Sequence, residues 1–354
     1  MAAPSASVIR SLPKCDLHSH IDGSIPLGEL FRIARRHRRT ITTQSGTEID
    51  SVSAFARHVK GPGYDSMLEN IVERFYPITN LMQTPEILRD VGRSYVAGLK
   101  RDNIAYAEGR FAPQYHTKES LPLEEVIESM AEGLAEGCER YGVKVKLIVA
   151  IGRESKPEFG QKVAKVAAGS RSVVALDLGG PEAGNPPEKF RGAFKLAADG
   201  GLKVTVHAGE GAGSVEQNLK NIRTAISDIG AQRVGHAIDL AKDESLVSLA
   251  MERSVTIEMN PVSNMVLGKI RGPSDLAIDR LLKEGVCVTV NSDDPALWPR
   301  GCVSDVLISV CRAYRFGLDA LDILVTNSIM GAFAGENEKA ALLEEYHAVR
   351  KKLS

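Results

Sequence analysis

The sequence predicts a single α/β domain, a (β/α)8 barrel of the TIM type with a helical insertion after its first strand. Three observations favour this fold. The chain has 354 residues, a length within the range of one barrel that carries insertions. Eight short runs rich in β-branched and apolar residues recur along it, separated mostly by helix-length stretches. Many of these runs end in a polar residue, as expected where parallel strands open into one shared cavity.

The eight runs define the expected strands. From the second run onward, stretches such as Leu123–Tyr141 and Val215–Ile229 connect them, which is the βα repeat of a parallel sheet. Eight such units favour a closed barrel. The expected strands are Cys15–His20, Ile104–Phe111, Val145–Ile151, Val173–Leu178, Leu202–His207, Arg233–His236, Val255–Met259 and Val286–Asn291.

The connection after the first strand is much longer than the others and predicts several helices. We expect them to form an insertion at about residues 25–101, over the barrel mouth. No Pro/Gly/Ser-rich linker or repeat divides the chain, so residues 1–354 are expected to form one domain. The expected helices are Leu27–Arg39, Ile49–His58, Tyr64–Met82 and Glu86–Arg101. Four of their apolar residues are more typical of helix packing than of a roof over a pocket: Phe55, Met67, Phe75 and Met82.

Composition and charge exclude several classes of protein. Hydrophobic residues at 43% and charged residues at 25% are typical of a globular domain. With 44 Lys+Arg against 45 Asp+Glu, no net field attracts nucleic acid or anionic lipid, and the basic run Arg35–Arg39 is typical of a solvated helix end. The chain has no apolar run near the ~20 residues of a membrane helix and no secretory signal. We therefore expect a cytoplasmic protein with neither nucleic acid nor membrane as partner.

Two histidines mark the end of the first expected strand. His18 and His20 are two residues apart, so their side chains lie on one face of a strand and can reach one ion. An imidazole pair of this kind favours a borderline metal such as zinc. Two histidines that alternate by chance would give the same pattern, and the pair alone does not decide between these alternatives.

Chemically useful residues also follow the fifth and eighth expected strands. His207 ends the fifth, and Glu210 follows after two small residues, which would let a metal ligand and a proton donor serve one substrate. Asp293 and Asp294 follow the eighth, where one could complete a metal site and the other could bind substrate. Alone, Glu210 is typical of a solvated loop acid, and Asp294 before Pro295 is typical of a turn. The combination is more specific than its parts.

Two further patterns have alternative interpretations. His236 ends the sixth expected strand, where it could orient a reacting water, although a single core histidine is the commoner case. Gly209, Gly211 and Gly213 are reminiscent of a phosphate-binding loop, but they lack the GxGxxG spacing and a Walker lysine. We give the phosphate loop little weight.

With these motifs the sequence resembles the adenosine deaminase family of the amidohydrolase superfamily. The resemblance extends from about residue 12 to residue 340, and the motifs come in the order of the family. It implies a (β/α)8 barrel and hydrolytic deamination of an adenine-type ring. The matching segments are Leu12–Lys14, His18–Ser24, Arg110–Pro113, Leu176–Gly180, His207–Glu210, Arg233–His236 and Asn291–Pro295.

The resemblance also implies a cofactor, one zinc ion per chain. Its ligands would be His18, His20, His207 and Asp293. Bound zinc lowers the pKa of water from ~15.7 towards 7, so that hydroxide can attack C6 of a purine at neutral pH. Ammonia then leaves, and an inosine-type product remains.

The other matching residues take implied roles around the purine nucleoside, a small-molecule partner. Glu210 would protonate purine N1, which requires a pKa raised by burial. His236 would handle the attacking water. The remaining roles are contact with that water or the purine by Asp294, a backbone contact to the purine by Gly180, and substrate binding by His20 and by Asp22, the latter at the sugar 5′ hydroxyl.

The sequence departs from the family near the substrate. Ala237 stands where the family frequently has glycine, which we expect to be tolerated, and Pro181 stands where an acidic residue often follows. The segment Gly179–Pro187 could reshape the pocket, and its ending Pro186–Phe190 is similar to adenine deaminase-like members. Aspartate at position 22 favours a nucleoside, so we expect adenosine or a related adenine nucleoside as substrate. The alternatives are adenine, another aminopurine nucleoside such as aminodeoxyfutalosine, and a catalytically silent member that binds a nucleoside or a partner. The oligomeric state is left open.

Overall fold

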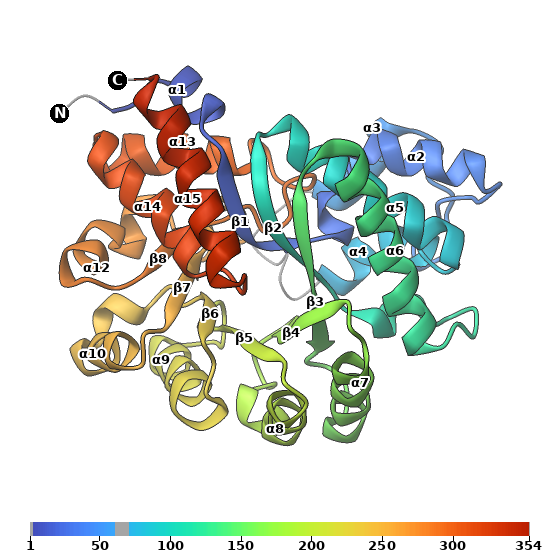
Figure 1. Ribbon diagram of the computed structural model, residues 1–354. Coiled ribbons are helices and arrows are strands. Elements are labelled where there is room, and N and C mark those ends of the chain that lie inside the picture. Colours follow the sequence, from blue (N-terminus) through green and yellow to red (C-terminus); the bar gives the residue numbers. More distant parts are fainter. Residues whose placement is uncertain (1–2, 61–70, 354) are drawn as a thin grey trace.

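Eight parallel strands form the centre of the molecule and follow one another in the sheet in sequence order (Figure 1). The computed structural model describes residues 3–60 and 71–353. Helices connect successive strands on the outside, so the predicted TIM barrel is confirmed. The strands are β1 (Lys14–His20), β2 (Ile104–Phe111), β3 (Lys144–Gly152), β4 (Val173–Gly179), β5 (Lys203–Ala208), β6 (Arg233–His236), β7 (Thr256–Met259) and β8 (Val288–Val290).

The barrel closes through the residues that follow β8. The backbone N–H of Asp293 donates to the carbonyl of His18 at 2.9 Å, and the N–H of His20 donates to the carbonyl of Asp293 at 2.8 Å. The side-chain oxygen of Asn291 accepts from the N–H of Leu17 at 3.1 Å. The eighth predicted strand, Val286–Asn291, is longer than β8, because after Asn291, whose N–H still donates to the carbonyl of Met259 at 3.0 Å, the chain turns to β1. This closure brings the end of β1 against Asp293.

A ring of helices surrounds the strands (Figure 1). Its close packing is clearest between α5 and α6, where a Cβ on Gly133 would lie 2.3 Å from the carbonyl oxygen of Arg89. The glycine lets the two backbones touch. Among the described residues, the ring and the capping helices comprise α1 (Ala6–Ser11), α5 (Pro85–Arg101), α6 (Leu123–Tyr141), α7 (Pro157–Gly169), α8 (Arg191–Asp199), α9 (Val215–Thr224), α10 (Glu244–Glu252), α11 (Pro261–Val266), α12 (Ile278–Glu284), α13 (Val303–Tyr314), α14 (Leu318–Met330) and α15 (Glu336–Lys351).

The long first connection contains α2 (Leu27–Arg36), α3 (Val52–Lys60), α4 (Ile71–Leu81) and α5. Because α5 packs along α6, it is the crossover helix of the first βα unit, and the added part is α2–α4. Phe55 and Met82 are fully buried in helix packing, as expected. Phe75 on α4 lines the cavity described below, and Met67 lies outside the described residues.

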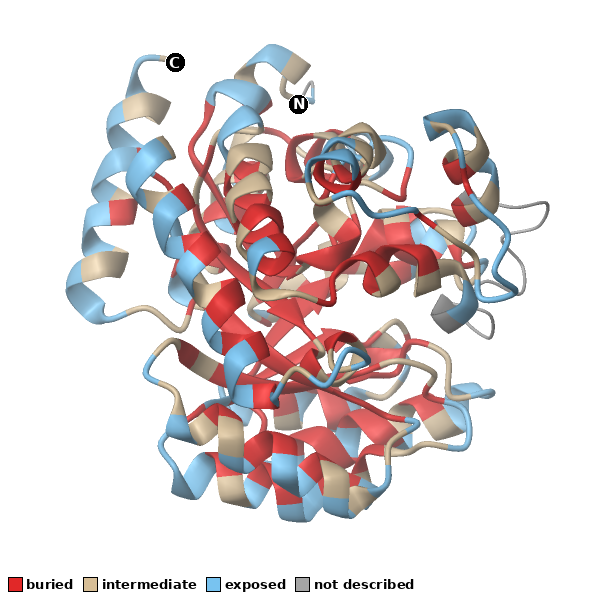
Figure 2. Ribbon diagram, turned by 90° about the vertical axis from the view of Figure 1, so that its right-hand side faces the viewer, coloured by how far each residue is buried: buried red, intermediate tan, exposed pale blue. Residues whose placement is uncertain are grey.

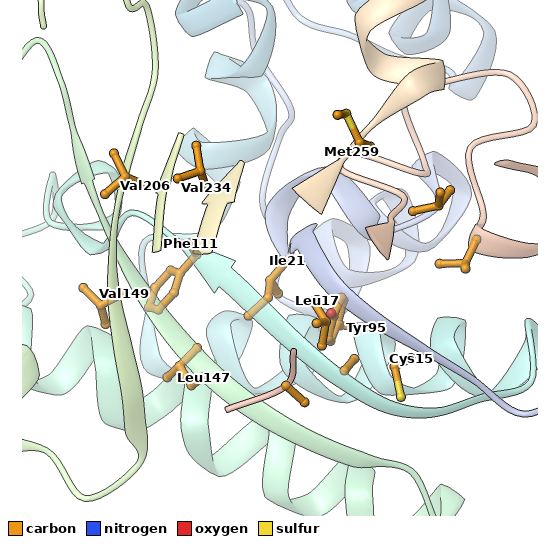
Figure 3. Packing of buried hydrophobic residues seen from close by; sticks show 14 of the residues in the cluster. Cys15, Leu17, Ile21, Tyr95, Phe111, Leu147, Val149, Val206, Val234 and Met259 are labelled. Atoms are coloured by element: carbon orange, nitrogen blue, oxygen red, sulfur yellow. The ribbon is translucent and has the colours of Figure 1, made fainter. Parts of the chain in front are cut away.

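The burial pattern separates a buried strand layer from exposed outer helix faces (Figure 2). Apolar residues from several strands and from Tyr95 of α5 pack together around β1 and β2 (Figure 3). The Tyr95 hydroxyl also pairs with the Ser19 hydroxyl at 2.6 Å, which ties α5 to the end of β1. Within residues 3–60 and 71–353, no helix combines the length and the apolar character that crossing a membrane requires.

Candidate active site

The predicted site residues gather round one cavity at the carboxyl ends of the strands. Two side chains of α4, Phe75 and Thr79, border the same cavity, as does Tyr115 from the loop after β2. His18 is fully buried next to the lining residues His207 and Asp293. The predicted residues that line the cavity are His20, Asp22, Gly180, His207, Glu210, His236, Asp293 and Asp294.

Four ligand atoms from β1, β5 and the loop after β8 converge on one point. The Nε2 atom of His207 lies 3.1 Å from Nε2 of His18 and 3.2 Å from Nε2 of His20. Oδ1 of Asp293 lies 3.4 Å from Nε2 of His18 and 3.4 Å from Nε2 of His20. Ligand atoms about 2.1 Å from a tetrahedral zinc lie about 3.4 Å from one another. These four separations therefore suit one zinc-sized ion.

His236 also belongs to this cluster, since it, His18, His207 and Asp293 offer ligand atoms within 4.8 Å of one another. Its two ring nitrogens are engaged elsewhere, however. The side-chain amides of Asn264 and Asn260 lie 3.0 Å from Nδ1 and 3.4 Å from Nε2. Among the described residues, Nε2 of His20 has no side-chain amide beside it and instead lies 3.2 Å from Nε2 of His207 and 3.4 Å from Oδ1 of Asp293.

Two carboxylates contact the Nδ1 atoms of His18 and His207, on the side of each ring opposite the converging Nε2 atoms. Glu258 of β7 lies 2.6 Å from Nδ1 of His18, and Asp177 of β4 lies 3.0 Å from Nδ1 of His207. A carboxylate on Nδ1 fixes the ring orientation and leaves Nε2 free to face a metal. The sequence analysis missed Glu258, although a glutamate inside the apolar run Val255–Met259 was a signal for it.

The interior of the barrel behind the ligand histidines contains charged side chains. Five side chains with at most 1% exposure form a continuous network there. Arg110 binds Asp177 at 2.7 Å and Glu258 at 3.2 Å, and Arg233 binds Glu258 at 2.5 Å and Glu108 at 2.6 Å. Burial alone would raise the pKa of Glu258, but the two guanidinium groups hold it well below its usual range. The network therefore keeps the carboxylates of Glu258 and Asp177 ionised next to the ligand histidines.

The imidazoles differ in protonation. Burial lowers the pKa of His20 to about 3 and also lowers that of His207, so both are neutral and suited to bind a metal. At His18, burial and Arg110 oppose the charged form, yet hydrogen bonds to Asp293 and Glu258 raise the pKa. Because a metal binds the neutral imidazole, binding a cation would oppose this rise in pKa.

Glu210 is the acid of the site. Its side chain is buried, and Oε1 lies 3.6 Å from Nδ1 of His236. Burial, followed by the charges of Asp293 and Glu182, raises its pKa to about 8. Burial lowers the pKa of His236 well below its ordinary value. At neutral pH the site therefore holds a protonated carboxyl beside a neutral imidazole, a donor and an acceptor of protons.

Asp22 and Asp294 both line the cavity near the end of β1. Burial and the neighbouring charge of Asp293 raise the pKa of Asp294 well above its ordinary value, and burial raises that of Asp22 to about 6. Gly23 makes room for this pair, because a Cβ there would lie 1.7 Å from Oδ1 of Asp294. The glycine after Asp22 is thus required by contact rather than only by a turn.

Three non-glycine residues at the site have positive φ. The angles are 67° at His236, 45° at Ala237 and 61° at Asp293. Such left-handed backbone is unfavourable for residues with a Cβ and persists where the surrounding structure imposes it. It also explains why glycine suits position 237. The methyl group of Ala237 is accommodated, as expected, but at a backbone cost.

The fold and this arrangement together define a class: a TIM-barrel hydrolase of the amidohydrolase type, with a His/Asp cluster at the strand ends. Comparison with known proteins gives the family. The adenosine deaminase family model matches residues 13–349, and the chain belongs to that family. It is accordingly a hydrolytic deaminase that acts on C–N bonds in cyclic amidines.

Relatives cover nearly the whole chain. Adenosine deaminase from Clostridium acetobutylicum is 30% identical over 95% of this chain and 98% of its own length. Adenine deaminase from Wolinella succinogenes is 29% identical over 94% and 96%, respectively. The crystal structure of adenine deaminase from Arthrobacter aurescens superposes with a TM-score of 0.85 at 27% identity, covering 96% of this chain and 99% of that one. The relatives thus include deaminases of both the nucleoside and the free base.

Proposed function

We propose that this protein is a zinc-dependent deaminase that converts adenosine or a related adenine nucleoside to the inosine-type product and ammonia. One observation carries the proposal. Glu210, a buried acid whose pKa is raised to about 8, shares a cavity with a cluster of metal-type ligand atoms. Hydrolytic attack on a purine needs both, because the ring must accept a proton while water adds to carbon.

The donor set supports zinc as the metal. Three imidazole nitrogens and one carboxylate oxygen are ligands that zinc prefers, and their spacing suits a tetrahedral ion. Zinc, when bound, supplies a nucleophilic water at neutral pH. The residues that would hold it are His18, His20, His207 and Asp293.

The remaining proton transfers would belong to the chain's own residues. Glu210 would donate its proton to purine N1 and so let N1 accept the electron pair of the C6–N1 double bond as water adds to C6. The neutral His236 would take a proton from the attacking water at Nε2, where the Asn260 amide lies at 3.4 Å, and that proton would leave with the amino group as ammonia. Asp294, whose pKa is raised well above its ordinary value by burial and the charge of Asp293, would in its protonated form donate a hydrogen bond to the purine or to that water. Gly180 has φ of 99° and no side chain, which leaves its backbone open to the purine plane.

The lining of the cavity supports an uncharged substrate. Asp22, which lines the cavity just after β1, would accept a hydrogen bond from a sugar hydroxyl. Among the described lining residues there is no lysine or arginine, whereas phosphate groups are usually bound by such cations. We therefore propose a nucleoside in preference to a nucleotide.

Adenine is the second candidate, favoured by the adenine deaminases among the relatives. A panel of adenosine, 2′-deoxyadenosine, adenine and AMP distinguishes the two when ammonia release and the change in purine absorbance are followed. We expect adenosine to be deaminated with the highest kcat/KM, and Asp22→Ala to reduce that value while leaving adenine unaffected. Turnover of adenine with adenosine inert would replace the nucleoside by the free base. Inactivity of the zinc-loaded protein on all four would refute the proposal.

A further inference from the structure

Glu182 is a buried carboxylate that the mechanism above does not use. It lies in the loop after β4 and is only 2% exposed. No lysine or arginine of the described chain forms an ion pair with it within 4.0 Å. Burying an ionised carboxylate is costly unless hydrogen-bond donors surround it. The partners of Glu182 therefore indicate what it is for.

Four N–H groups donate to Glu182. Oε1 accepts from the backbone of Gly209 at 2.9 Å and from the side-chain amide of Asn221 at 2.7 Å. Oε2 accepts from the backbones of Glu210 at 2.9 Å and Gly211 at 3.2 Å. Three consecutive backbone N–H groups of the loop after β5 thus converge on one side chain, a typical anion-binding concavity.

Gly209, Gly211 and Gly213 were considered above as a phosphate-binding loop. The N–H groups of this loop do bind an acceptor, but the acceptor is the Glu182 carboxylate of the protein rather than a phosphate. Gly209 has φ of 73°, and a Cβ on it would lie 2.6 Å from Ile222 of α9, so glycine is needed there for the N–H groups to turn inward. The side chain of Glu210 projects from the middle of the segment that Glu182 holds.

The opposite side of the same loop is also tied down. The fully buried guanidinium of Arg153 donates to the carbonyl of His207 and, at 3.0 Å, to the carbonyl of Asn185. Arg153 thus fixes the start of the loop, and Glu182 fixes its middle. The charge of Glu182 also contributes, after burial and Asp293, to the raised pKa of Glu210.

We propose that Glu182 is a positioning residue for the reaction: by binding the amides of residues 209–211 it aims the Glu210 carboxyl at the substrate ring. The inference rests on the proposed function. It concerns the loop conformation, so it applies whether the substrate is a nucleoside or the free base.

Glu182→Gln tests this role, because it keeps the size of the side chain but turns an NH2 group towards backbone N–H donors. We expect kcat to fall on the order of 10- to 100-fold, as for a misplaced catalytic group, with metal content unchanged. Affinity for 1-deazaadenosine, which lacks N1, should stay within about twofold, whereas affinity for purine riboside, which retains N1, should fall with kcat. If the free base is the substrate, 1-deazaadenine and purine replace these two ligands. Equal loss for both ligands would indicate a merely structural role and overturn the proposal.

Two further variants make the result interpretable. Glu188→Gln removes a carboxylate from the same connection, where Glu188 lies 3.6 Å from Lys220, and should leave kcat unchanged. If Glu182→Gln does not fold, Asn221→Ala removes one of the four donors and should lower kcat severalfold; an unchanged kcat there contradicts the role. Wild-type inactivity on every purine would refute the proposed function itself, whereas an active wild type beside an equally active Glu182→Gln refutes only the role of Glu182.

Discussion

The substitution Glu210→Gln should affect turnover and the free energy of unfolding in opposite directions. In the folded chain burial raises the pKa of Glu210 to about 8, against an ordinary value of 4.5. A folded state that binds the proton more tightly loses stability as pH rises from 4.5 towards 8, because the unfolded chain gives up its proton first. Glu210→Gln is always neutral and lacks this penalty. The variant should therefore be less active and more stable.

The magnitude follows from the interval between pH 4.5 and pH 7. At 1.36 kcal/mol per pH unit, it amounts to about 3 kcal/mol in the free energy of unfolding. A bound cation would favour the ionised carboxylate, so about 3 kcal/mol is the upper limit. Loss of the proton donor should lower kcat by about 10²- to 10⁴-fold, the usual contribution of a general acid.

Urea unfolding at pH 5 and pH 7, metal analysis and steady-state kinetics check these expectations. Glu210→Gln should gain stability over the wild type at pH 7 and little at pH 5, with metal content retained. The exposed Glu216 of α9 provides the matched control, since Glu216→Gln should change neither stability nor turnover. Undiminished deamination by Glu210→Gln would refute the acid role, and a stability difference independent of pH would refute the buried proton.

Further expectations concern pH, metal and backbone. Deamination should fall about tenfold per pH unit above pH 8 as Glu210 loses its proton, and a flat alkaline limb would contradict this. Glu258→Gln should weaken zinc affinity about 10- to 100-fold in a chelator competition, since it loosens a ligand histidine; unchanged affinity would exclude that role. Gly23→Ala should abolish most turnover in kinetic assays, because its methyl group would overlap Asp294, and undiminished turnover would contradict this contact. Ala237→Gly should raise the free energy of unfolding by about 1 kcal/mol in urea titrations, and a loss of stability would contradict the inferred strain.

Much of the fold could be predicted because it depends on local pattern. Each of the eight apolar runs corresponds to a strand, since β-branched runs between helix-length stretches specify a parallel sheet. The boundaries were less accurate where long-range contacts decide them. β8 ends at Val290 because the next residues pair with β1, and no local feature of Val286–Asn291 indicates that partner.

The sequence alone determined which residue types stand at the strand ends, and His18, His20, His207, Glu210 and Asp293 needed only that placement to meet. A parallel barrel carries every strand end to one rim, so local order along the chain becomes proximity in space.

Only the tertiary structure decided how those groups are supported. The Glu258 and Asp177 carboxylates behind the histidines, the Glu182 carboxylate beneath the loop of Glu210, and the crowding that requires Gly23 all join segments remote in sequence. Such contacts depend on side-chain direction and on the few tenths of an ångström that separate a hydrogen bond from an overlap. Periodicity and spacing carry no information at that scale, because they fix the face of an element and not its partner.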